Sequence, residues 1–125
     1  MDRLFFAVAS IVMFLGVAAG AFGAHGLSAY FEQHVDLKSS FDTALRYLFI
    51  HGLALMAVAW ATTRWPGPLI NLAGVLFITG IIVFSGSLFL LSLTGMRWLG
   101  AITPIGGLAF LAGWLLLIIT AWRGE

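Results

Sequence analysis

The chain has 125 residues, of which 62% are hydrophobic and only 9% are charged, and it contains no cysteine. Soluble domains carry about 25% charged residues, so this composition excludes a soluble globular enzyme and a disordered chain. The net charge of +1 gives no electrostatic basis for binding nucleic acid. The missing cysteines exclude disulfides, thiolate catalysis and cysteine-ligated metal centres. The class that remains is an integral membrane protein.

Four long apolar stretches, at about residues 4–27, 41–63, 69–93 and 98–122, predict four transmembrane helices in a single integral membrane domain, residues 1–125. Each stretch is continuously apolar, whereas the strands of a membrane β-barrel alternate in polarity. The connecting segments are short, so neighbouring helices should be antiparallel. The expected fold class is therefore all-α: a four-helix transmembrane bundle with up-down-up-down topology.

The first stretch carries small residues on one helical face, namely Ala9, Gly16, Gly20 and Gly23. Small residues mark contacts between membrane helices, because lipid gives apolar side chains no reason to associate. We therefore expect Gly16, Gly20 and Gly23 to pack against another helix. A basic start at Arg3 resembles a signal peptide. The apolar stretch is longer than such a peptide requires, so we expect the helix to be retained.

Residues 28–40 form the only long polar segment and are expected to be a loop that contains a solvated His34. His25 precedes this loop and falls opposite the glycines if the first helix stays regular. Either that helix breaks before its end, or the His25 ring points to the membrane interface. Asp42 and Arg46 lie four residues apart at the start of the second stretch and are expected to pair with each other.

The second stretch places Tyr47 and His51 on a face that otherwise carries small residues, so His51 should point into the bundle. His51 lies about ten residues, or ~15 Å, into the helix, near the middle of a ~30 Å hydrocarbon core. A polar group at that depth is a candidate functional residue. A neutral histidine can also be purely structural, bonded across helices to Ser85, Ser92 or a backbone carbonyl, and the sequence leaves both roles open.

The third and fourth stretches add hydroxyl groups and glycines to the same bundle. Thr103 and Pro104 predict a kink or a late helix start, and Gly106 and Gly113 predict a second small-residue contact. In an antiparallel bundle the polar residues should gather in the half of the membrane away from the termini. The candidate polar cluster comprises His25, Tyr47, His51, Ser85, Ser87, Thr103 and Pro104.

No cofactor or metal is expected. His25 and His51 are the only plausible pair of haem ligands, but their depths differ by ~10 Å or more, whereas axial ligands must be level. The three histidines lie at different depths, so they do not form the convergent set of ligands that a zinc site needs. The serines have no clear base partner, and the five acidic residues lie at helix ends or in loops, so we expect no enzymatic activity.

Orientation follows from the distribution of basic residues, which favour the cytoplasmic side of a membrane. One side carries Arg3, Arg64 and Arg123, and the other carries Lys38 and Arg97, with Arg46 just inside the second helix. We expect the protein in the inner, or plasma, membrane with both termini in the cytoplasm.

Several motifs occur together and in order along nearly the whole chain: Gly20-Ala-Phe-Gly-Ala-His25, Tyr47-x-x-x-His51-x-Leu-Ala-Leu55, Phe84-Ser-Gly-Ser-Leu88, Thr103-Pro-x-Gly-Gly107 and Phe110-Leu-Ala-Gly-Trp114. The combination resembles the small four-helix membrane-protein family called domain of unknown function 423, which includes bacterial YgdD-type proteins and is similar to eukaryotic transmembrane protein 256. The resemblance implies four spans in an inner membrane and no recognised cofactor. Arg46 departs from the family pattern.

The sequence thus leads to a functional hypothesis with one main alternative, and an unrecognised enzyme is the third possibility. The first is a non-catalytic interaction or accessory protein of the membrane, whose partners are the lipid bilayer and either another membrane protein or a second copy. The alternative is a small-solute or ion carrier, or a pore, that uses the polar cluster in the outer half of the bundle. Fold alone cannot choose between them.

Overall fold

The computed structural model describes residues 1–124, which form helices and connecting turns without any strand. In chain order the elements are α1 (Asp2–His25), α2 (Ser28–Gln33), α3 (Val35–Arg64), α4 (Pro68–Gly80), the π-helical turn η1 (Ile81–Ser85), α5 (Gly86–Thr94), the 3-10 turn η2 (Arg97–Ala101) and α6 (Thr103–Arg123). Because α4, η1 and α5 are continuous, four of the resulting helical segments are long and apolar enough to cross a membrane. The predicted all-α class with four spans is confirmed.

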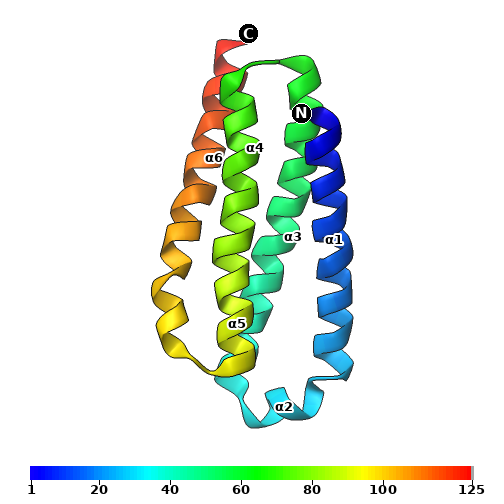
Figure 1. The fold of residues 1–125 in the computed structure, drawn as a ribbon, viewed down its shortest axis with the longest axis vertical. Helices are drawn as coiled ribbons and strands as arrows, with labels where there is room; N and C mark the ends of the chain where they lie inside the picture. Colours follow the sequence, from blue (N-terminus) through cyan, green and yellow to red (C-terminus); the bar gives the residue numbers. More distant parts are fainter. Residues whose placement is uncertain (125) are drawn as a thin grey trace.

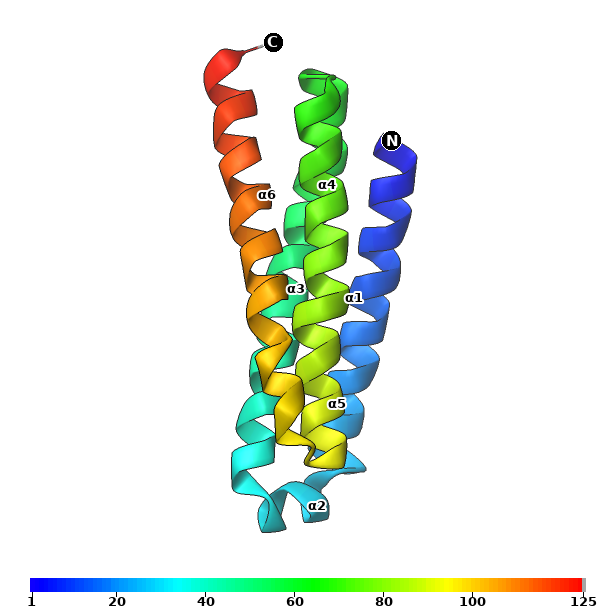
Figure 2. The same ribbon diagram turned by 60° about the vertical axis from the view of Figure 1, so that its left-hand side comes forward.

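The central part of the bundle is formed by α3 and the continuous helix α4–η1–α5, which contact each other along their length. In both views α1 and α6 lie on opposite sides of this central pair (Figures 1 and 2). The contacts of α1 are mainly with α3, and those of α6 are mainly with α4 and η1. Both termini lie at one end of the bundle, and α2 lies at the other (Figure 1). We call these the terminal end and the α2 end.

The glycines of α1 lie against α3. A Cβ atom at Gly16 would come within 2.6 Å of the Leu48 side chain, and one at Gly23 within 2.5 Å of the Phe41 ring. The helices therefore approach closely at these two positions, and large side chains of α3 fill the space that the glycines leave. Gly20 has more room, because the nearest atom of Leu45 would lie 3.7 Å from its Cβ.

The glycines of α6 have the same role against the central helix. A Cβ atom at Gly113 would come within 2.6 Å of the Phe77 ring. At Gly106 the added atom would collide with the backbone of Phe84 itself. Helix α6 and the π-helical turn are therefore in backbone contact, which a side chain at position 106 would prevent.

The segment that the sequence presented as a polar loop is largely helical. Residues 28–33 form α2, and α3 begins at Val35, ahead of the predicted span at 41–63. The physical reason is that the segment carries apolar anchors among its polar residues: Phe31 and Leu37 are only 3% and 5% exposed. Both belong to a small apolar cluster with Phe41, Leu91 and Leu99, which covers the α2 end of the bundle.

The expected pair between Asp42 and Arg46 is wrong. Asp42 instead accepts a hydrogen bond from the ammonium of Lys38, one turn earlier, at 2.7 Å. Arg97 in η2 pairs with Asp36 at the start of α3. Both ion pairs are exposed. Each includes one residue of the segment 36–38 in the first turn of α3, which the sequence predicted to be a loop.

The connection between α5 and α6 explains the late start of the last helix. Gly95 ends α5 in the left-handed conformation, with a φ of 73°, which glycine adopts without steric cost. The 3-10 turn follows, and α6 begins at Thr103 with Pro104 in its first turn, where a missing N–H costs no helical hydrogen bond.

Candidate functional site

His51 lies near the middle of α3 and is 3% exposed. Its Nδ1 is 2.8 Å from the backbone carbonyl of Tyr47, one turn earlier. The indole Nε1 of Trp114, on α6, donates to His51 Nε2 at 3.1 Å. Because an indole can only donate and a carbonyl can only accept, Nε2 must be unprotonated and Nδ1 must carry the hydrogen. The ring is therefore neutral, and both of its nitrogens are engaged.

Aromatic rings surround His51 on several sides. Its ring stacks on Phe110, with centroids 3.5 Å apart and planes within 9°. Phe77 approaches at a tilt, with a centroid distance of 5.5 Å. Tyr47 packs in turn on Phe84, at 4.4 Å between centroids. Three spans therefore supply the rings around one imidazole, and α6 supplies both the stacking partner and the hydrogen-bond donor.

A groove of about 520 Å³ opens beside this cluster, between α3, η1 and α6. We call it the His51 groove. Its lining residues are Tyr47, His51, Phe84, Pro104, Gly107, Leu108, Phe110, Leu111 and Trp114. Leu108 and Leu111 are more than 60% exposed, so the groove faces the side of the bundle, where the lipid would lie. The wall is almost entirely apolar, and the groove is suited to binding an apolar group rather than to proton transfer.

The serines and the threonine of the predicted cluster form separate contacts between helices. Ser85 Oγ donates to the backbone carbonyl of Ala44 on α3, at 2.8 Å. Ser87 and Thr103 join α5 to α6 through their hydroxyls, at 2.6 Å. Tyr30 of α2, which the sequence did not single out, donates to the carbonyl of Ser92 at 2.8 Å. These bonds satisfy polar groups within the bundle, and none of them involves His51.

The predicted cluster therefore separates into two parts. Tyr47, His51 and Pro104 line the His51 groove, whereas the hydroxyls lie in contacts between helices. His25 belongs to neither part: it is exposed at the end of α1, where its backbone carbonyl accepts from Ser28 Oγ at 3.0 Å. The reason is the bundle geometry, because α1 packs on α3 and lies on the opposite side from α6 (Figure 2).

Trp114, Phe110 and Phe84 are the site residues that reasoning from polarity missed. Tyr47–His51 and Phe110–Trp114 are both aromatic pairs at a spacing of four residues, which places each pair on one helical face. Two such pairs on different spans are the signal that could have suggested an aromatic contact between α3 and α6. Among the described residues, no group of three or more histidine and acidic side chains could hold a metal ion.

Comparison with known proteins gives consistent matches along the chain. The family described as "Protein of unknown function (DUF423)" matches residues 19–107. A UPF0382 membrane protein of Staphylococcus haemolyticus is 41% identical over 121 residues, which cover 97% of each chain. The UPF0382 membrane protein YwdK of Bacillus subtilis is 37% identical over 121 residues, which cover 95% of this chain and 96% of YwdK. No solved structure matches significantly. The chain therefore belongs to the DUF423 family of membrane proteins.

Proposed function

We propose that this protein is a non-catalytic accessory protein of the membrane, which binds a transmembrane helix of a partner protein through the His51 groove. The observation that carries the proposal is the lateral position of the groove, beside a histidine whose two nitrogens are already engaged. A groove that opens to the side of a bundle is reached from within the bilayer. The ligand that fits this position is a membrane-embedded one.

The bonding of His51 argues against an enzymatic role. A general base must have a free nitrogen within reach of the proton it accepts, and neither nitrogen of His51 is free. Ser85 forms a hydrogen bond with the Ala44 carbonyl, and Ser87 forms one with the Thr103 hydroxyl. Neither serine is therefore paired with a base, as a serine nucleophile would be. The polar groups of the site hold the aromatic cluster in place.

The shape and chemistry of the groove favour a helix with a bulky apolar side chain. Gly107 leaves room in the wall, because the nearest side-chain atom, in Phe84, would be 3.8 Å from an added Cβ. The rings of Tyr47 and Trp114 flank this space, and such rings combine a large apolar surface with one polar atom. Contact of this kind depends on van der Waals fit, which is what drives association of helices in lipid.

Photo-crosslinking in native membranes tests the proposal. A photoreactive residue at Leu108 should give one adduct of defined mass, because this position lines the groove. The same residue at Ile118, which is also exposed on α6 but lies outside the groove, is the matched control and should not give it. Gly107→Leu, which fills the groove, should remove the adduct. Identical adducts at both positions, or an adduct that survives Gly107→Leu, would contradict the proposal.

The carrier alternative has one observation in its favour. The π-helical turn η1 supplies Phe84 to the groove wall, and π-helical turns inside α-helices often occur at functional sites. Flux of a small solute into vesicles that contain the purified protein, abolished by Trp114→Ala, would favour a carrier over an accessory protein.

We also propose an inner-membrane location with both termini in the cytoplasm. The support is the set of three arginines at the terminal end, Arg3, Arg64 and Arg123, against Lys38 in the first turn of α3 and Arg97 in η2 at the α2 end, with Arg46 further along α3. Reporter fusions at the C-terminus and between α1 and α3 test the orientation. A C-terminal fusion that is active only in the periplasm would reverse the assignment.

A further inference from the structure

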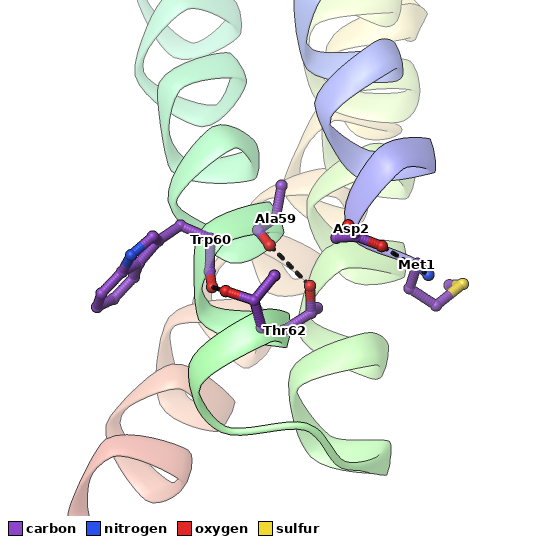
Figure 3. A network of polar contacts seen from close by, with 6 residues as sticks. Met1, Asp2, Ala59, Trp60 and Thr62 are labelled. Atoms are coloured by element: carbon purple, nitrogen blue, oxygen red, sulfur yellow. Dashed lines mark hydrogen bonds and ion pairs between the residues drawn. The ribbon is translucent and has the colours of Figure 1, made fainter.

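A second groove, separate from the His51 groove, lies between α1 and α3 at the terminal end. It has a volume of about 430 Å³. Asp2, Arg3 and Phe6 are among the residues that line it from α1, and Met56, Trp60 and Thr63 are among those that line it from α3. Figure 3 shows this end of the bundle, where Met1 and Asp2 lie beside the last turns of α3. We call it the Arg3 groove.

The polar side chains around the Arg3 groove do not close it. Thr62 donates to the carbonyl of Ala59, and Thr63 donates to that of Trp60, both at 2.7 Å (Figure 3). These bonds stay within α3 and form no link to α1. The groove therefore remains accessible from the side of the bundle, and its wall between Met56 and Trp60 is largely apolar.

The ion pairs among residues 1–124 compensate the charge of Asp2 at this groove but not that of Arg3. The carboxylate of Asp2 is 3.6 Å from the ammonium of Met1, so these two charges offset each other. Arg3 forms no ion pair with any residue from 1 to 124. A guanidinium offers a planar fork of donors that matches a phosphate. Arg3 lies in the first turn of α1, at the end of the bundle, and the ends of a membrane-spanning helix are expected near the lipid headgroups.

We propose that the Arg3 groove binds one anionic phospholipid, with the headgroup phosphate on Arg3 and an acyl chain along Met56 and Trp60. The segment from Met56 to Thr63 is about 10 Å long, which covers the upper part of an acyl chain. Trp60 is 60% exposed beside the groove, near the level where tryptophan is enriched in membrane proteins. Charge complementarity selects the anionic lipid over a zwitterionic one.

Quenching of tryptophan fluorescence by brominated lipids tests this site directly. The full chain is reconstituted in phosphatidylcholine vesicles that contain a small fraction of either phosphatidylglycerol or phosphatidylcholine with brominated acyl chains. The signal of Trp60 is the difference between the natural chain and Trp60→Phe. Brominated phosphatidylglycerol should quench this signal several-fold more strongly than brominated phosphatidylcholine at the same mole fraction.

Two arginine variants provide the matched comparison. Arg3→Gln should remove the preference for phosphatidylglycerol, and Arg3→Lys should retain part of it. Arg123→Gln, at the same end but on α6, should keep the full preference. Equal quenching by both lipids, a preference that survives Arg3→Gln, or an equal loss in both glutamine variants would overturn the proposal. Native mass spectrometry of the purified protein gives a second measurement: retained phosphatidylglycerol should be lost in Arg3→Gln only.

Discussion

At the α2 end of the bundle, side-chain hydrogen bonds connect elements that are far apart in the sequence. At the terminal end, the side-chain hydrogen bonds among residues 1–124 stay within single helices. Tyr30 reaches Ser92, Ser85 reaches Ala44, Ser87 reaches Thr103, and Arg97 reaches Asp36. In the terminal half, residues 1–12, 52–77 and 115–124, the side-chain hydrogen bonds of the described residues join positions three or four apart, as in Thr62 to Ala59. The bond between His51 and Trp114 lies between the two halves.

The two halves are therefore held together by different forces. The terminal half depends on fit, for example the fully buried Phe5 ring over Gly74. Lipid provides no hydrophobic drive to keep such apolar surfaces together. The α2 half adds directional bonds between helices, which specify which helix pairs with which. We infer that the α2 half defines the fold and that the terminal half is the more adaptable part.

The largest expected loss of stability comes from the substitution of a glycine in the α2 half. Gly106→Ala should destabilise the bundle by about 3 kcal/mol, the upper range for overpacking, because the added methyl group meets the Phe84 backbone. Unfolding by SDS titration in mixed micelles measures it. Gly107→Ala is the neighbouring control and should have little effect. Gly74→Ala, which meets only the Phe5 side chain, should cost less than Gly106→Ala. An equal cost would show that the backbone contact at Gly106 adds nothing to the effect of a side-chain contact.

Trp114→Phe should have the next largest effect, about 1–2 kcal/mol, because it leaves His51 Nε2 buried without its donor. The same titration measures it. Trp122→Phe on the same helix, where the side chain is 90% exposed, is the control and should leave the unfolding free energy unchanged. If both variants behaved alike, the indole–imidazole bond would contribute nothing to stability.

Ser85→Ala should cost about 0.6 kcal/mol, the average for a hydrogen bond between membrane helices, because it removes the bond to the Ala44 carbonyl. Ser10→Ala in the terminal half is the matched control, since Ser10 bonds only to Phe6 on its own helix. The midpoint of SDS unfolding should shift for Ser85→Ala alone. A larger shift for Ser10→Ala would reverse the comparison.

Asp36→Asn should have the smallest effect on stability. The pair between Asp36 and Arg97 joins distant segments, but both side chains are more than half exposed, and exposed ion pairs contribute little and are screened by salt. We expect no measurable change in the SDS midpoint at moderate ionic strength. A clear loss of stability that disappears in high salt would show that this exposed pair belongs with the bonds that hold the α2 half.

The packing of the bundle was predictable from the sequence because small residues recur at a helical period. Gly16 and Gly106 were assigned to contacts between helices from that period alone, and they lie at such contacts. The identity of the partner was not predictable in this way. Ser85, Ser92 or a backbone carbonyl of another helix was the expected partner of His51, but the partner across helices is the Trp114 indole, whose position depends on how α6 lies on the central pair.

Two features had no usable signal in the sequence. The π-helical turn at Ile81–Ser85 lies between Gly80 and Gly86. These glycines do not distinguish a π-helical turn from a continuous α-helix, so the sequence does not predict it. The segment from 28 to 40 has the composition of a loop, and only the burial of Phe31 and Leu37 reveals why it is helical. Both are consequences of tertiary packing, which overrides local composition.

The bond between Trp114 and His51 also constrains the order of events during synthesis. The two residues are 63 positions apart, so α3 is synthesised before α6. In that interval one nitrogen of His51 is satisfied by Tyr47 on its own helix, and the other has no partner from α6. Until α6 is made, His51 Nε2 therefore lacks its Trp114 donor, and the packing of α6 on α3 supplies it.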